Sequence, residues 1–80
     1  MKQMKTINFC KKDGLRTTVT LSEIQVDLAD RLAEFYGISR SKMFADIAAE
    51  VRGNVNLSNA IRDWMYVKLV EILALKGVDL

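Results

Sequence analysis

The chain of 80 residues contains no proline, no histidine and a single cysteine, Cys10. One cysteine cannot form a disulfide within the chain, and without histidine a zinc or haem site lacks its usual nitrogen and sulfur ligands. We therefore expect no cofactor and no metal. A domain of this length buries only about 60% of its unfolded surface, so its core is marginal without such supports. Good packing or a second subunit must supply the stability instead, and we favour a homodimer.

Long apolar runs are also missing, since no stretch approaches the roughly 18 apolar residues of a membrane span. Residues 1–12 are basic but lack the apolar centre of a signal peptide. Together with the free thiol, this favours the cytoplasm and no membrane partner. No glycine-rich phosphate loop is present, and the acids Asp27, Asp30 and Glu34 are expected on a solvated helix face. The sequence therefore does not indicate an enzyme.

Charge is unevenly distributed, although the net charge is only +2. Residues 1–16 contain five basic residues and one acid, whereas residues 17–50 contain three basic residues and six acids. A basic segment ahead of an acidic body fits contact with a polyanion, and it equally fits a solvated tail.

Residues 16–21 alternate in character as a β-strand does. One face would carry Thr17, Val19 and Leu21, and the other would carry the hydrogen-bonding side chains of Arg16, Thr18 and Thr20. A lone strand is not stable, so it must pair. Residues 6–10 also alternate and are followed by an Asp-Gly turn signal. Pairing with residues 6–10, pairing with a copy of itself in a second chain, or both, remain open.

Three helices are predicted downstream, at 22–36, 40–52 and roughly 59–76. Ser22 and Ser39 are suitable caps for the first two, Gly37 separates them, and Ser58 or Asn56 can cap the third. The buried stripe expected on the first helix is Ile24, Leu28, Leu32 and Phe35. The face expected to be buried on the second helix is Met43, Phe44, Ile47, Ala48 and Val51. The third helix is apolar on nearly every side, which implies a second buried contact, between subunits.

A strand bearing arginine and hydroxyl groups, a helix, a glycine turn and a second helix follow one another over residues 16–51. This order, with the Gly-Ile-Ser-Arg-Ser turn at residues 37–41, resembles the ribbon-helix-helix family of DNA-binding proteins. The resemblance implies a mostly helical fold with a short β-strand, assembled as an intertwined homodimer. In that dimer the strands of two chains form an antiparallel β-ribbon, to which the third helix is an addition.

The resemblance also implies roles for individual residues. The base-reading side chains would be Arg16, Thr18 and Thr20. The phosphate-binding groups would be Ser39, Arg40, Ser41 and Lys42 at the start of the second helix, with Lys11 and Lys12 from the basic segment. The oligomer interface would comprise Val19, Leu21, Leu28, Leu32, Phe44, Ile47, Trp64 and Leu69.

These expectations divide the chain into a basic arm over 1–15, a ribbon-helix-helix core over 16–53 and a C-terminal helix over 54–80. The expected function is sequence-specific binding of double-stranded DNA by a transcriptional repressor or regulator. The alternatives are an accessory protein of conjugation or plasmid maintenance, an antitoxin of the same fold, or a protein-interaction module without DNA. Whichever of these functions applies, the C-terminal helix would build higher oligomers or bind a partner protein.

Overall fold

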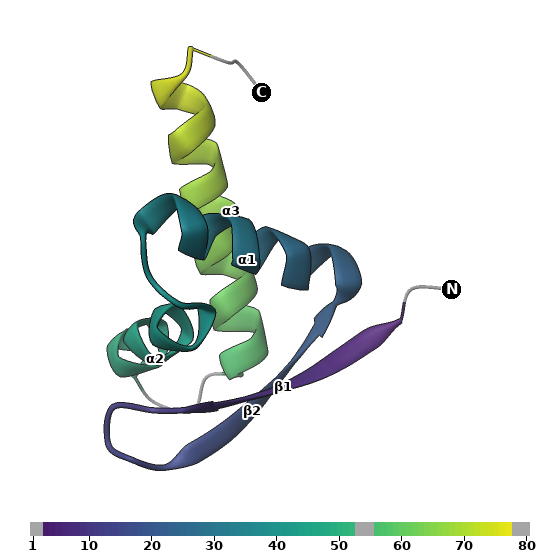
Figure 1. Ribbon diagram of the computed structural model, residues 1–80, viewed down its shortest axis with the longest axis vertical. Coiled ribbons are helices and arrows are strands. Elements are labelled where there is room, and N and C mark those ends of the chain that lie inside the picture. Colours follow the sequence, from purple (N-terminus) through teal and green to yellow (C-terminus); the bar gives the residue numbers. More distant parts are fainter. Residues whose placement is uncertain (1–2, 53–55, 78–80) are drawn as a thin grey trace.

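A computed structural model describes residues 3–52 and 56–77. The chain forms two strands and then three helices: β1 (Met4–Cys10), β2 (Arg16–Ser22), α1 (Glu23–Tyr36), α2 (Arg40–Glu50) and α3 (Leu57–Leu75). The hairpin lies at one end of the molecule, α1 crosses α3, and the C-terminal half of α3 projects beyond the other elements (Figure 1). The expected mostly helical chain with a short β element is therefore confirmed. The predicted domain boundary at 53/54 lies outside the described residues.

The turn between the strands is built from Lys12, Asp13 and Gly14. The Lys11 N–H donates to the Leu15 carbonyl and the Gly14 N–H donates to the Lys11 carbonyl, each at 2.9 Å. Gly14 has a φ of 88°, a left-handed conformation that a three-residue hairpin loop requires and that glycine adopts without strain. The Asp-Gly signal in the sequence thus marks a real hairpin.

β1 and β2 pair antiparallel, with Thr6 opposite Thr20, Asn8 opposite Thr18 and Cys10 opposite Arg16. Of the two pairings that the sequence leaves open, the one within the chain is present. The extra strand starts at Met4, two residues before the predicted 6–10. Because side chains alternate, Phe9, Val19 and Leu21 point toward the helices and are buried.

The other edge of β2 contacts α3. The Thr20 N–H donates to Ser58 Oγ at 3.0 Å, and the Thr20 carbonyl oxygen accepts from Arg62 Nη2 at 2.6 Å. In an antiparallel pair, such outward-directed backbone groups are where a further strand would bond. A copy of β2 along this edge would therefore have to displace Ser58 and Arg62.

Local capping explains where each helix begins and ends. Ser22 and Gln25 form a reciprocal capping box at the start of α1, and Gly37, with a φ of 70°, ends that helix. Ser39 caps α2 by accepting from the Lys42 N–H. Asn56 caps α3, which begins at Leu57, so Ser58 is left to bond Thr20. These limits match the predicted helices to within a few residues.

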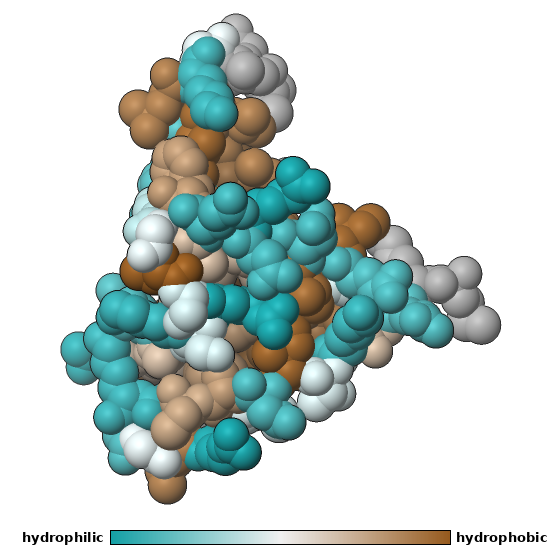
Figure 2. Space-filling model, viewed as in Figure 1, coloured by the Kyte–Doolittle hydropathy of each residue, from teal (hydrophilic) through white to brown (hydrophobic). Residues whose placement is uncertain are grey.

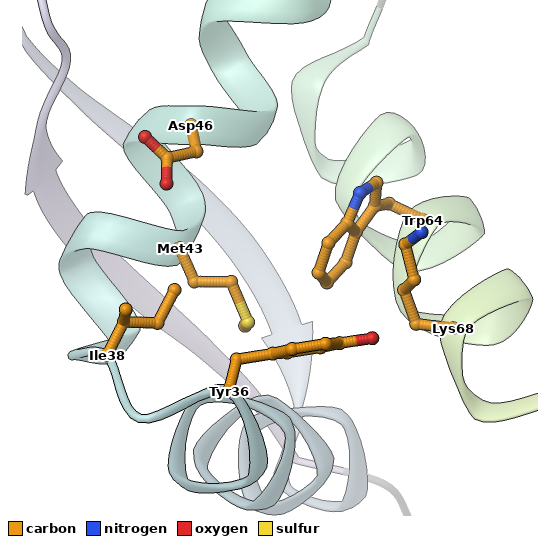
Figure 3. A pocket seen from close by; sticks show the side chains of 6 residues that line it. All are labelled: Tyr36, Ile38, Met43, Asp46, Trp64 and Lys68. Carbon is orange, nitrogen blue, oxygen red and sulfur yellow. The ribbon is translucent and has the colours of Figure 1, made fainter. Parts of the chain in front are cut away.

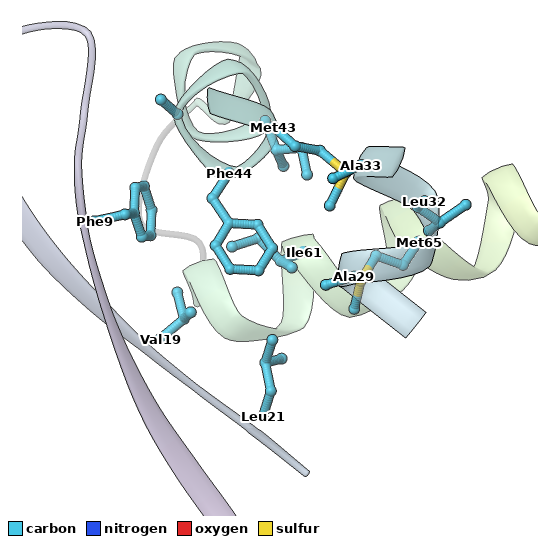
Figure 4. Packing of buried hydrophobic residues seen from close by; sticks show 12 residues of the cluster. Phe9, Val19, Leu21, Ala29, Leu32, Ala33, Met43, Phe44, Ile61 and Met65 are labelled. Atoms are coloured by element: carbon cyan, nitrogen blue, oxygen red, sulfur yellow. The ribbon is translucent and has the colours of Figure 1, made fainter. Parts of the chain in front are cut away.

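The core lies between the hairpin and the three helices, with Phe44 pointing into its middle (Figure 4). Phe44 contacts Phe9 edge-on, with ring centroids 5.5 Å apart, and Ile61 and Met65 close the core from α3. The prediction for α1 is partly wrong, since Ile24 and Phe35 are exposed while Ala29, Leu32 and Ala33 form its buried face. The small side chains of Ala29 and Ala33 allow α1 to pack closely on the core. Ile24 and Phe35, at the two ends of the predicted stripe, then point outward.

Candidate nucleic-acid interface

The hairpin has an outer face that no helix covers. β2 contributes Arg16, Thr18 and Thr20 to this face, as the sequence predicts, and all three are exposed. β1 contributes the alternate exposed residues Met4, Thr6, Asn8 and Cys10. We call this set the outer hairpin face. Cross-strand pairing places Asn8 beside Thr18 and Thr6 beside Thr20, so hydrogen-bonding groups form two adjacent rows.

These side chains suit the recognition of base edges. An arginine guanidinium can bond guanine O6 and N7 together, and an asparagine amide can bond adenine N6 and N7. A threonine can donate, accept, or contact a thymine methyl group. The major groove of DNA admits a two-stranded β-ribbon of this kind. The outer hairpin face therefore has both the shape and the chemistry for direct readout.

Arg16 carries the only charge among the outward side chains of the two strands. Within residues 3–52 and 56–77, no hydrogen bond or ion pair engages its guanidinium. Most other basic side chains are held by acids of the same chain, such as Lys5 by Glu23 and Arg31 by Asp27. Arg16 is thus left available to an external anion or base.

Sequence analysis missed Thr6, Asn8 and Cys10 as members of this face. Their strand was recognised by its alternation, but its pairing partner was not determined. Once β1 pairs with β2, the register alone assigns these three residues to the same face as Arg16. The alternation of residues 6–10 was the signal that could have found them.

Two of the predicted phosphate-binding lysines lie at the hairpin turn. Lys11 Nζ is 3.7 Å from Asp13 Oδ2, and Lys12 Nζ is 3.0 Å from Asp46 Oδ1. The Lys12 ammonium beside it holds the pKa of Asp46 below its ordinary value, against the opposing effect of desolvation, with further help from Lys42. The turn is therefore fastened to α2 while remaining basic and exposed at Lys12.

The other predicted phosphate-binding residues lie at the start of α2. The Lys42 N–H is already used by the Ser39 cap. Arg40 Nη1 donates to Asp30 at 3.2 Å, and Lys42 Nζ donates to Asp46 at 3.4 Å. The backbone N–H groups of Arg40 and Ser41 belong to the first turn, which has no partners within its own helix. α2 packs on the inner side of the hairpin, so this end does not join the outer hairpin face.

The residues predicted for an oligomer interface fall into two groups. Five of them are buried inside the chain itself: Val19, Leu21, Leu32, Phe44 and Ile47. Leu28, Trp64 and Leu69 are half-buried. The first group therefore stabilises the single chain, and only the second retains surface for a neighbour.

A hollow of about 300 Å³ lies between α2 and α3, where Tyr36, Met43 and Trp64 face one another (Figure 3). Lys68 Nζ lies 5.6 Å from the centre of the Trp64 ring, and Asp46 lies at the edge of the hollow. The charges of Lys68 and Asp46 are already paired with Glu71 and with two lysines. The hollow thus offers apolar surface but no unpaired charge to orient a ligand.

Among the described residues, none of the helices combines the length and apolar character needed to cross a membrane. In the same part of the chain, no group of three or more acidic or cysteine side chains is arranged to hold a metal ion. No family model, no curated protein and no solved structure matches the chain. The likeness to ribbon-helix-helix proteins therefore stays a likeness of sequence pattern.

Proposed function

We propose that this protein binds double-stranded DNA by inserting the outer hairpin face into the major groove, and that it regulates transcription by doing so. The observation that supports this most is the unpaired guanidinium of Arg16 on a two-stranded ribbon. The other polar side chains of the outer hairpin face are uncharged hydrogen-bonding groups, and none of its side chains is acidic. Nucleic acid is the partner that this combination suits best.

Arg16 and Asn8 would specify bases, because each can make a paired contact with one purine. Thr18 and Thr20 would add shorter contacts along β2. Lys12, at the exposed turn, would contact phosphate and add affinity without sequence preference. The orphan N–H groups at the start of α2 are a second candidate for phosphate.

The hairpin of a single chain already forms a two-stranded ribbon. The resemblance to ribbon-helix-helix proteins would instead require one strand from each of two chains. The hairpin presents the same predicted side chains of β2, Arg16, Thr18 and Thr20, on a two-stranded ribbon. A ribbon made by pairing β2 with its copy would require the release of Ser58 and Arg62 from Thr20. We therefore propose that the hairpin of a single chain contacts the bases, and that the homodimer forms through a different surface.

The test begins with selection of a preferred site from random duplexes, followed by affinity measurements on that site and on random DNA over a range of salt. Arg16→Ala should lose preference by about ten- to a hundredfold at one base position, as expected for a paired contact. Lys12→Ala should weaken binding to all sequences alike and lower the salt slope by about one. Arg31→Ala, which removes an exposed arginine from α1, is the matched control and should change neither property.

The proposal fails if selected and random duplexes are bound equally weakly at low salt, or if Arg31→Ala weakens binding as much as Arg16→Ala. Failure of that kind would favour the protein-interaction module, in which the hairpin only completes the fold. Footprinting on genomic fragments separates the remaining roles. A bound site over a promoter indicates a repressor or regulator, one at a transfer origin indicates an accessory protein of conjugation, and one ahead of a toxin gene indicates an antitoxin.

A further inference from the structure

Helix α3 has two apolar faces, of which the protein covers one. Ile61 and Met65 point into the core and are buried. On the outward side, Tyr66, Val67 and Val70 are 69%, 53% and 39% exposed. These residues lie from the middle of α3 (Leu57–Leu75) onward. Figure 2 shows apolar side chains at the surface of the end of α3 that projects beyond the other elements. Neighbouring exposed apolar side chains on one helix face are the kind of surface that binds a partner.

The spacing of the outward residues is that of a coiled-coil seam. Tyr66, Val70 and Leu73 follow one another at intervals of four and three residues. In heptad terms Val70 occupies an a position, and Tyr66 and Leu73 occupy d positions. In parallel coiled coils, a β-branched residue at a with leucine at d favours two strands, and Val70 with Leu73 fits this rule. The pattern therefore points to another helix with the same seam.

We propose that a second copy of this chain packs along this stripe, with the two α3 helices side by side and parallel. The seam would consist of Tyr66, Val70 and Leu73 from each copy, flanked by Val67 and Ala74. A seam of little more than one heptad forms a weak coiled coil on its own, because ordering a short isolated helix is unfavourable. Here α3 is already ordered by Ile61 and Met65 in the core, so pairing requires little further ordering.

The parallel direction rests on the proposed function. Ser58 and Arg62 hold the hairpin at the N-terminal end of α3, and the free end projects at the opposite end of the molecule (Figure 1). A parallel pair therefore places both hairpins at the same end, where one duplex could meet both. An antiparallel pair would place them at opposite ends. Two-fold DNA sites match two-fold proteins, so the parallel pair suits DNA binding.

The interface is tested by sedimentation of the full chain without DNA. Val70→Glu places like charges at the seam and should weaken the dimer by at least roughly tenfold. Ile24→Glu is the control, because Ile24 is an exposed β-branched residue on α1, 72% exposed against 39% for Val70, and it should leave the dimer intact. Circular dichroism verifies that both variants fold. A monomeric wild type, or a dimer that survives Val70→Glu, would overturn the proposal. If Ile24→Glu abolished the dimer and Val70→Glu did not, the contact would lie on α1 instead.

The direction is tested by oxidative cross-linking in a Cys10→Ser background. In a parallel pair, Tyr66→Cys, Val70→Cys and Leu73→Cys should each link to their own copy, because equivalent positions face each other. An antiparallel pair centred on Val70 would link Val70→Cys to itself, but would link Tyr66→Cys only to Ala74→Cys. The second result would overturn the parallel arrangement. Arg16→Ala should leave every cross-link unchanged, so loss of DNA binding and loss of the dimer are separate failures.

Discussion

The guanidinium of Arg62 donates a 2.6 Å hydrogen bond to the backbone carbonyl of Thr20, 42 residues earlier in the chain. The same side chain also bonds Gln25 at the start of α1 and Asn59 within α3. Arg62 thus joins β2, α1 and α3 at one point. It also occupies the strand edge at which another chain could otherwise add a strand.

Arg62→Ala should lower the free energy of unfolding by about 1–3 kcal/mol, since it removes charge-assisted hydrogen bonds and leaves the Thr20 carbonyl without its partner. Arg62→Lys should recover only part of this loss, because an ammonium cannot reach three acceptors in the same plane. Arg31→Ala, which breaks an exposed pair with Asp27, is the comparison and should cost under about 0.5 kcal/mol. Urea unfolding of the three variants measures these differences. Equal losses for the two alanine variants would contradict the joining role of Arg62.

Much of the fold could be predicted because its signals are local. Ser22, Ser39 and Gly37 fix helix ends through hydrogen bonds made within a few residues, and the strand of residues 16–22 is evident from its alternation. For the same reason, the outward placement of Arg16, Thr18 and Thr20 was predictable from the strand alone. Hydrogen bonds and side-chain alternation among near neighbours can be inferred from the sequence alone.

The features that escaped prediction depend on contacts between distant segments. The free edge of β2 is occupied by Ser58 and Arg62 of α3, and nothing near residue 20 in the sequence indicates this. The buried face of α1 is set by how closely Ala29 and Ala33 pack in the core, so Ile24 and Phe35 turn outward despite their hydropathy. Asn8 joined the candidate site only through the register with Thr18.

Two phenylalanines should differ sharply when each is replaced by alanine. Phe44 is fully buried and contacts Phe9, whereas the Phe35 side chain is more than half exposed. Phe44→Ala should cost about 3–5 kcal/mol because it leaves a cavity in the centre of the core. Phe35→Ala should cost no more than about 1 kcal/mol, since most of its surface already contacts water. Thermal and urea unfolding measure both, and a Phe35→Ala loss as large as that of Phe44→Ala would contradict this placement of the core.

The hairpin turn should depend on glycine for conformational reasons alone. A side chain added at Gly14 would meet no atom within 4 Å, but the φ of 88° is unfavourable for any residue with a Cβ atom. Gly14→Ala should therefore destabilise the protein by about 1–2 kcal/mol. Gly14→Asn should cost less, because asparagine tolerates left-handed conformations. If the two variants lost equal stability in urea unfolding, the effect would not be one of backbone conformation.

Acid should loosen the attachment of the hairpin turn to α2. The ion pair with Lys12, assisted by the charge of Lys42, holds the pKa of Asp46 below its ordinary value. A carboxyl whose pKa is lowered by folding stabilises the folded state above its ordinary pKa, and that contribution is lost as the pH falls through the lowered value. The stability difference between the wild type and Asp46→Asn should therefore be present at neutral pH and shrink below about pH 4. Lys12→Ala should reduce that pH dependence and raise the pKa of Asp46, which an NMR titration of its carboxyl carbon measures directly. An Asp46 titration unchanged by Lys12→Ala would show that the ion pair with the turn does not form in solution.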